Sequence, residues 1–140
     1  MKKSKQKHYV EPEEQMPSKV TIPGLLTRKN TGTKILCLTA YDFPTARLID
    51  EAGFDVLLVG DSMANVLYGM KNTHKITLDT IIQHSISVRK GIKKSLLVID
   101  MPKGSYKTPA QAKKNAKLIF KKTNCDAVKI ESNNRNFKII

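Results

Sequence analysis

The chain has 140 residues, of which 40% are hydrophobic, and its 25 Lys and Arg residues against 12 Asp and Glu residues give a formal net charge of +13. This length and hydrophobic content suit one globular domain, and the longest apolar runs fall far short of the roughly 20 residues that a membrane helix needs. We therefore expect neither a second domain nor a membrane span. The excess of lysine allows nucleic-acid binding, but the densest lysine group contains one aromatic residue, Phe120, which is expected on the inward face of its helix and not in a platform for base stacking. We expect that group to be the solvent face of a helix: Lys113, Lys114, Lys117, Lys121 and Lys122.

Residues 1–18 are predicted to be a disordered lead-in. The segment begins with lysines, but no apolar stretch follows, as a secretory signal peptide would require, and its glutamates argue against a transit peptide. The two cysteines, Cys37 and Cys125, lie in apolar segments without metal-binding or redox spacing. We expect both to be buried free thiols of a protein in a reducing cytosol.

The first half of the remaining chain, which spans 19–140 in all, predicts a strand, a helix and a second strand. Residues 34–42 are apolar and rich in strand formers. A helix is predicted to begin near Pro44 and to end at Gly53, with an inward face at helical spacing. The next strand, 55–61, is almost continuously apolar, which is typical of a parallel strand covered on both faces. The predicted inward helix residues are Ala46, Leu48, Ile49 and Ala52.

The second half repeats this pattern after a loop from Ser62 to about Ile76. Thr77 is the expected N-cap of a helix that ends at Gly91, and 95–100 is the third strand. Thr108 is the expected N-cap of the next helix, which is followed by a strand over 127–131. Strands alternating with helices predict right-handed crossovers and a parallel α/β sheet. The inward residues expected on the two helices are Leu78, Ile81, Ile82, Ser85, Val88, Ala112, Ala116, Ile119 and Phe120.

Each predicted strand ends on a carboxylate: Asp42, Asp61, Asp100 and Glu131. Ligands of parallel sheets bind beyond the carboxyl ends of the strands, where these side chains would gather. Several carboxylates at one place repel each other unless a cation or basic side chains compensate them. Oxygen ligands without His or Cys favour a hard cation, above all Mg²⁺. The alternative is that each aspartate only caps the loop or helix that follows it.

Six short motifs follow one another in a fixed order between about residues 21 and 131. This ordered set resembles the ketopantoate hydroxymethyltransferase family, although any one motif would be weak by itself. The motifs are TAYD at 39–42, VGDS at 59–62, THKITLD at 73–79, IDMP at 99–102, GSYKTPAQA at 104–112 and VKIE at 128–131.

The resemblance implies a (β/α)₈ TIM barrel that uses Mg²⁺ and transfers a hydroxymethyl group from 5,10-methylenetetrahydrofolate to α-ketoisovalerate, in pantothenate biosynthesis. By position, Asp61 and Asp100 match the direct metal ligands, and Glu131 matches a third carboxylate that can act through water. Ser62 and Lys129 match the groups that hold the keto-acid carboxylate. On the residues alone, Ser62 is also suited to a turn, and Lys129 to a strand whose ammonium group reaches the solvent.

The resemblance also implies a cytoplasmic homo-oligomer, with keto acid and folate as its small-molecule partners. His74 and Lys103 depart from the family pattern in the substrate loop, whereas His84 is interpreted as a packing or surface residue of its helix. An eight-unit barrel needs about 250 residues, so we expect this chain to be a truncated form with about the first four βα units. The family's general base belongs to the other half, and no residue here is assigned as proton acceptor.

Two further roles stay open on the sequence. The chain can be a non-catalytic partner subunit, whose exposed sheet docks onto a complementary half-barrel. It can also be a basic nucleic-acid-binding protein, which the scattered lysines make the less favoured reading. Residues 132–140 contain no helix start that the pattern identifies.

Overall fold

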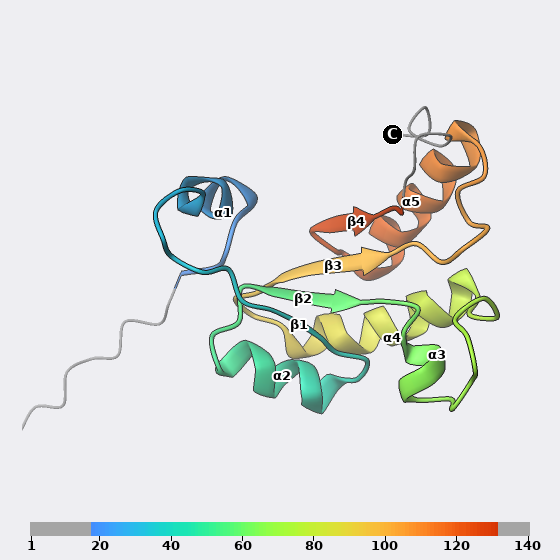
Figure 1. The fold of residues 1–140 in the computed structure, drawn as a ribbon, viewed down its shortest axis with the longest axis horizontal. Helices are drawn as coiled ribbons and strands as arrows, with labels where there is room; N and C mark the ends of the chain where they lie inside the picture. The colour runs from blue at the N-terminus through green and yellow to red at the C-terminus, as the bar shows by residue number, and fades with distance from the viewer. Residues whose placement is uncertain (1–17, 132–140) are drawn as a thin grey trace, which may run out of the picture.

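The computed structural model describes residues 18–131, which form one parallel sheet of four strands with the helices between them (Figure 1). The lead-in predicted at 1–18 lies outside these residues except for Ser18, as do residues 132–140. The elements in chain order are α1 (Ile22–Arg28), β1 (Cys37–Thr39), α2 (Phe43–Glu51), β2 (Val56–Val59), α3 (Met63–Val66), α4 (Leu78–Gly91), β3 (Leu96–Asp100), α5 (Pro109–Thr123) and β4 (Ala127–Lys129).

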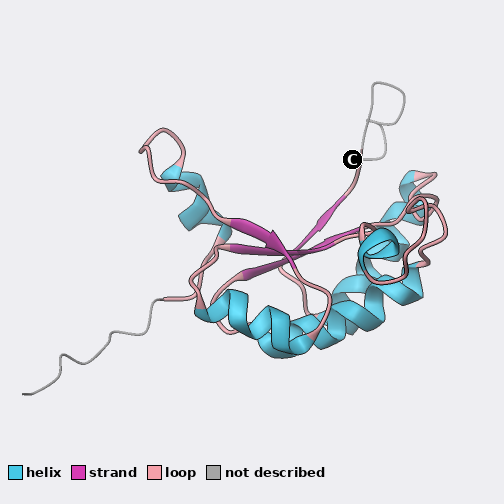
Figure 2. Cartoon of the chain, turned by 60° about the horizontal axis from the view of Figure 1, so that its bottom comes forward, coloured by secondary structure: helices cyan, strands magenta, loops and turns pink. Residues whose placement is uncertain are grey.

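The strands follow one another in the sheet in sequence order, β1-β2-β3-β4, and every neighbouring pair is parallel. Right-handed crossovers that always step in the same direction place their helices on one face of the sheet. The helices between the strands do lie together on one side (Figure 2). This arrangement confirms the predicted parallel α/β sheet, and it is the arrangement of a barrel wall rather than of a doubly wound sheet.

The two faces of the sheet have different surroundings. Leu57 and Val59 of β2 are fully buried and register with Leu97 and Ile99 of β3, which are also fully buried. Because side chains alternate between faces along a strand, the residues between them point to the opposite face. There Leu58 is only half-buried, so β2 is not covered equally on both faces as its apolar run suggested. In the described chain one face carries the core and the other stays open.

Three helices begin at caps that the sequence makes recognisable. The Thr77 side chain accepts a hydrogen bond from the amide of Thr80, and that of Thr108 from the amide of Gln111, as predicted. Asp42, which was expected at a strand end, instead caps α2 by accepting from the Thr45 amide at 2.8 Å. Asp42 is therefore a structural cap and lies outside the candidate site.

Several packing predictions are wrong in detail. Leu48 is 62% exposed and Phe120 is 42% exposed, so these side chains face solvent instead of the core. Ala52 is also exposed, at the end of α2. Cys125 is buried as expected, whereas Cys37 is exposed because β1 is an edge strand. The predicted helix face of five lysines on α5 is exposed along its whole length, as expected.

Three aspartates, two of them buried and Asp126 partly buried, hold the amino-terminal ends of the strands together. Asp50 of α2 accepts hydrogen bonds from the amides of the segment 93–95, which leads into β3. Asp55, ahead of β2, accepts from the Leu36 amide and pairs with Arg28 at 2.6 Å. Asp126, ahead of β4, accepts from the amide of Leu97 at 2.8 Å and from Arg89 at 3.1 Å. These carboxylates are satisfied by protein donors, which indicates a structural role.

Gly91, the last residue of α4, lies against the backbone of α2. A Cβ atom added there would lie 2.7 Å from the Phe43 carbonyl oxygen and 2.9 Å from the Arg47 amide nitrogen. We therefore expect Gly91→Ala to force the two helices apart and to lower the free energy of unfolding by about 2 kcal/mol. Urea unfolding measures this loss, and Gln83→Ala, at an exposed position of the same helix, should change stability little. Equal stability of the Gly91→Ala protein would show that the helices can separate without cost.

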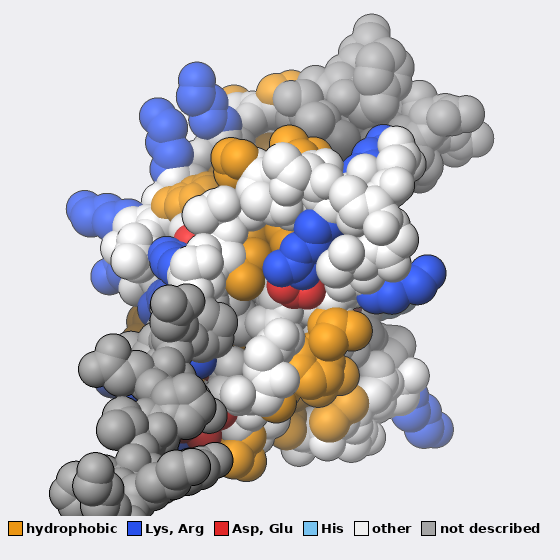
Figure 3. Space-filling model, turned by 90° about the vertical axis from the view of Figure 1, so that its left-hand side faces the viewer, with side chains coloured by type: hydrophobic (Ala, Val, Ile, Leu, Met, Phe, Trp, Pro, Cys, Tyr) orange, Lys and Arg blue, Asp and Glu red, His pale blue; other side chains and the backbone are white. Residues whose placement is uncertain are grey.

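No helix among the described residues is both long and apolar enough to cross a membrane. Seen from the amino-terminal ends of the strands, Lys and Arg side chains are scattered around the surface instead of gathering in one patch (Figure 3). Apolar side chains lie between them on the same face. On this face the positive charge is thus distributed, which does not favour a phosphate-binding surface there.

Candidate active site

The carboxyl-terminal ends of β3 and β4 bring two of the predicted site residues into direct contact. Asp100, the last residue of β3, registers with Lys129, the last residue of β4, on the open face of the sheet. Directly opposed side chains on neighbouring strands lie within reach of each other. The Lys129 Nζ atom lies 2.6 Å from Asp100 Oδ2 and 3.3 Å from Oε1 of Glu131. The contact between Asp100 and Lys129 is therefore a consequence of strand register.

The other three predicted residues belong to loops next to this pair. Asp61 and Ser62 form the turn between β2 and α3, one and two residues after Gly60. A Cβ atom added at Gly60 would lie 3.6 Å from Ser62 Oγ and 3.8 Å from Asp100 Oδ2, so Ser62 and Asp100 border the same small space. Glu131 is the last described residue, with 74% of its side chain exposed. Of the five predicted residues, only Asp100 is an almost fully buried carboxylate.

The protonation of Asp100 is under opposing influences. Burial is the largest cause and raises the pKa of Asp100, the hydrogen bond and positive charge of Lys129 work against this, and the charges of Glu131 and Asp61 raise it further. The net effect is a raised pKa. For Lys129, burial opposes the charged form, but the hydrogen bond and charge of Asp100, together with Glu131, outweigh it and raise the pKa of the ammonium group. The structure thus couples Asp61, Asp100, Lys129 and Glu131 electrostatically.

The donor set can be compared with what a magnesium ion requires. Within residues 18–131 no group of three or more His, Cys, Asp and Glu side chains is close enough to hold a metal by itself. Mg²⁺, however, usually keeps several waters and needs only one or two protein carboxylates. Asp100 Oδ1 is buried and has no hydrogen-bond partner among the described residues, and a Cβ atom at Gly60 would only touch Oδ2 of the same carboxylate, at 3.8 Å. An oxygen-only pair of Asp61 and Asp100 with an unsatisfied oxygen fits such an ion.

Ser62 is held by a tyrosine that the sequence alone did not single out. Its hydroxyl lies 2.7 Å from the hydroxyl of Tyr41, which is only 7% exposed. Tyr41 belongs to the TAYD motif, and Tyr106, within GSYKTPAQA, lies near the same carboxylates. Burial, followed by the charges of Glu131 and Asp100, raises the pKa of Tyr106. Membership of the ordered motifs was the one sequence signal that could have identified both tyrosines.

The two histidines occupy different surroundings. His84 is half-buried and hydrogen-bonds through both ring nitrogens, so it is more than a surface residue of α4. His74 lies in the loop before α4, with Nε2 3.3 Å from Lys103 Nζ. The two residues that depart from the family pattern, His74 and Lys103, therefore contact each other. Among the described residues, neither forms a hydrogen bond with Asp100.

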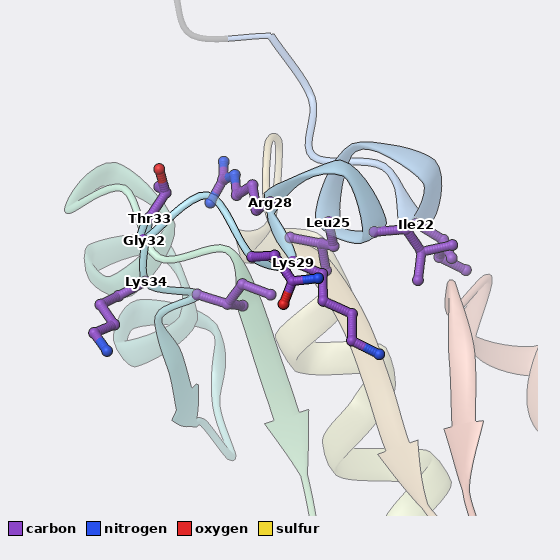
Figure 4. A pocket seen from close by; sticks show the side chains of 10 residues that line it. Ile22, Leu25, Arg28, Lys29, Gly32, Thr33 and Lys34 are labelled. Carbon is purple, nitrogen blue, oxygen red and sulfur yellow. The ribbon is translucent and has the colours of Figure 1, made fainter.

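A larger hollow of about 590 Å³ lies at the opposite end of the sheet, beneath α1 (Figure 4). Its walls include Ile22, Leu25, Leu26 and Ile35, with Lys29 and Lys34 at its edge, and none of the predicted site residues contributes to it. Its Arg28 is already paired with Asp55. Active sites of parallel barrels lie at the carboxyl-terminal ends of the strands, and the other end serves stability. We therefore assign the candidate site to the smaller space at Gly60.

The described residues form the wall of a parallel α/β barrel, with the candidate site at the carboxyl-terminal ends of its strands. Solved structures with this fold include a 2,3-dimethylmalate lyase of the PEP mutase/isocitrate lyase superfamily, with a TM-score of 0.58 and 18% identity over 81% of this chain and 40% of that one. An oxaloacetate acetylhydrolase gives a TM-score of 0.56 and 19% identity, over 71% of this chain and 35% of that one. At these identities the likeness shows the fold alone, which is the predicted TIM-barrel type.

The family follows from sequence. The family model for ketopantoate hydroxymethyltransferase matches residues 19–140, and the chain belongs to this family. It is 49% identical over 113 residues to the 3-methyl-2-oxobutanoate hydroxymethyltransferase of Pelagibacter ubique (strain HTCC1062), covering 81% of this chain and 44% of the relative. The enzyme of the same name from Anaplasma marginale (strain Florida) is 53% identical over 98 residues, 70% of this chain and 35% of the relative. The matched part of this chain thus spans less than half the length of each of these relatives.

Proposed function

We propose that this chain supplies the metal-binding and keto-acid-binding part of a hydroxymethyltransferase site that converts α-ketoisovalerate to ketopantoate in pantothenate biosynthesis. The hydroxymethyl group would come from 5,10-methylenetetrahydrofolate. The observation that carries the proposal is the buried Asp100 carboxylate: its Oδ2 contacts Lys129 and borders the space at Gly60, and its Oδ1 has no hydrogen-bond partner among the described residues. In a chain of this family, the ammonium group is suited to the negative charge of a keto acid, and the carboxylate is suited to the positive charge of Mg²⁺.

In this proposal, Ser62 and Lys129 bind the carboxylate of the keto acid through a hydroxyl donor and an ammonium group. Both belong to the region around Asp100, Lys129 by direct contact and Ser62 through the shared space at Gly60. Asp61 and Asp100 would hold Mg²⁺, with Glu131 acting through water, and the bound ion would supply Lewis-acid polarisation of the keto oxygen. The positive charge of Lys129 favours the negative charge that develops when the C3 proton leaves.

The described residues leave the proton acceptor unassigned. Tyr106 has a raised pKa and Asp100 contacts a lysine, so neither is well suited to take the C3 proton at neutral pH. The match covers only 44% of one relative, so the remaining part of a complete barrel offers further units in which a general base can lie. We therefore propose substrate and ion binding for this chain and place the general base in the remaining part of a complete barrel. The exposed thiol of Cys37 suits the reducing cytosol proposed for such an enzyme.

Proton NMR on the purified chain in D₂O tests the proposal directly, with Mg²⁺ and α-ketoisovalerate added separately and together. We expect broadening or shifting of the keto-acid signals that requires Mg²⁺ and disappears in Asp61→Ala. Loss of the C3 proton signal would be no faster than with Mg²⁺ alone if the general base lies elsewhere. Asp79→Ala, on the exposed first turn of α4, is the control for removal of one carboxylate. Keto-acid signals unchanged by the folded wild-type chain would refute the proposed function.

A further inference from the structure

The hydroxyl of Ser62 is held by a hydrogen-bonded network whose other members have no assigned role. Ser62 occupies the N-cap position of α3, yet its side chain makes no capping hydrogen bond. Its hydroxyl instead lies 2.7 Å from the buried hydroxyl of Tyr41. A serine at an N-cap ordinarily uses its oxygen for the helix amides. The Ser62 hydroxyl is therefore oriented by a buried tyrosine and not by the amides of α3.

The network continues from the backbone of Tyr41 to α4. His84 Nδ1 lies 2.6 Å from the carbonyl oxygen of Tyr41, and because a carbonyl can only accept, Nδ1 must carry the proton. In the neutral ring, Nε2 is then an acceptor. The hydroxyl of Tyr68 lies 2.8 Å from Nε2 and can donate to it, and the two rings meet edge to face at 86°. The contacts of His84 thus specify both its tautomer and its orientation.

The network begins and ends at α3, because Ser62 precedes this helix and Tyr68 follows it. Tyr68 lies just after α3, whose first residue follows Ser62, while Tyr41 follows β1 and His84 belongs to α4. Ser62, Tyr41, His84 and Tyr68 therefore join both ends of α3 to the end of β1 and to the helix behind it.

We propose that Tyr41, His84 and Tyr68 are positioning residues that orient the Ser62 hydroxyl toward the carboxylate of a 2-keto acid. This inference rests on the proposed function, because it concerns the same carboxylate. A serine that donates its single proton to a carboxylate can only accept from Tyr41. The Tyr41 hydroxyl thus donates to Ser62 Oγ, and its presence favours the serine rotamer in which the proton points at the ligand.

The variants Tyr41→Phe, His84→Leu and His84→Asn separate positioning from packing. Tyr41→Phe removes the hydroxyl that contacts Ser62. His84→Leu removes both ring nitrogens, whereas His84→Asn keeps an N–H donor at the position of Nδ1. Two dissociation constants are measured by NMR titration. The first is that of α-ketoisovalerate with Mg²⁺ present, and the second is that of Mg²⁺ without the keto acid. We expect Tyr41→Phe and His84→Leu to weaken keto-acid binding about tenfold, with Mg²⁺ binding unchanged and with partial recovery in His84→Asn.

The outcomes separate this inference from the proposed function. If the wild-type chain binds α-ketoisovalerate and the dissociation constants of Tyr41→Phe and His84→Leu stay within twofold of it, the positioning role is overturned and the proposed function is not. Parallel losses of Mg²⁺ and keto-acid affinity also overturn it, because they indicate general damage to the fold. A folded wild-type protein that binds no keto acid overturns the proposed function and the inference together. If Tyr41→Phe and His84→Leu lower the affinity for the keto acid but not for Mg²⁺, and His84→Asn restores part of it, the positioning role is supported.

Discussion

Replacing Lys129 by methionine is expected to change two affinities in opposite directions. Lys129 Nζ lies 2.6 Å from Asp100 Oδ2, so its positive charge competes with a metal ion for that carboxylate. Without it, Asp100 and Glu131 lose the cationic partner that they have among the described residues, and Mg²⁺ alone should bind about tenfold more tightly. The keto acid loses its charged anchor and should bind about 10–100-fold more weakly. Mg²⁺ and α-ketoisovalerate titrations, followed by NMR, measure both constants.

Lys113→Met provides the matched control, because it removes the same charge from an exposed position of α5. It should leave both affinities unchanged apart from a small general effect of net charge. If Lys129→Met weakens Mg²⁺ and keto-acid binding alike, Lys129 supports the site only by packing. If it changes neither constant, the ion pair with Asp100 is a structural feature and the proposed substrate site lies elsewhere.

Replacing Asp50 by asparagine is expected to be the most destabilising single change in the described chain that leaves side-chain size unaltered. The buried carboxylate accepts from the amides of Ser95 at 2.7 Å, Lys94 at 3.0 Å and Lys93 at 3.0 Å. An amide NH₂ at one of the two oxygen positions would face these donors and leave one or more without a partner. We expect the free energy of unfolding to fall by about 3 kcal/mol at pH 7, as measured by urea unfolding.

The pH dependence of this difference has a definite sign. Burial raises the pKa of Asp50, but the backbone hydrogen bonds from Ser95, Lys94 and Lys93 outweigh it, and the net result is a pKa below the ordinary carboxyl value of 3.8. A lowered pKa stabilises the fold above the ordinary value, and this contribution is lost as the pH falls through the lowered pKa. The stability gap between wild type and Asp50→Asn should therefore be full at pH 7 and narrow below pH 3.8. Glu51→Gln, on the exposed neighbouring residue, should show little difference at either pH.

Local signals predicted the connectivity of the fold better than its packing. Threonine caps at Thr77 and Thr108 were recognisable because the side-chain oxygen and the following helix are adjacent in sequence. Helix α1 was missed, although Thr21 caps it and a proline follows, because its short sequence has no buried residue and so no apolar periodicity. Phe120 was placed inward from spacing alone, whereas the sheet beside α5 leaves that side of the helix in solvent.

The site was predictable as a set of residue types but not as a set of contacts. The strand-end pattern identified Asp61, Asp100 and Glu131 because each follows an apolar run. The pairing of Asp100 with Lys129 depends on strand register, which no local pattern specifies. For the same reason the pattern could not separate Asp42, which caps a helix, from Asp100, which has a free buried oxygen. The role of Tyr41 depends on a contact across 21 positions of sequence.

The three aspartates at the amino-terminal ends of the strands also bear on how the protein unfolds. Asp50 joins α2 to the start of β3, Asp55 joins the starts of β1 and β2, and Asp126 joins β4 to β3 and α4. Local opening of one βα unit would therefore strip hydrogen bonds from its neighbour, so these units should exchange their amide protons as one cooperative block. Cooperativity is concentrated at the end of the sheet opposite the candidate site. The loops at the carboxyl-terminal end can then vary in sequence without loosening the scaffold that holds them.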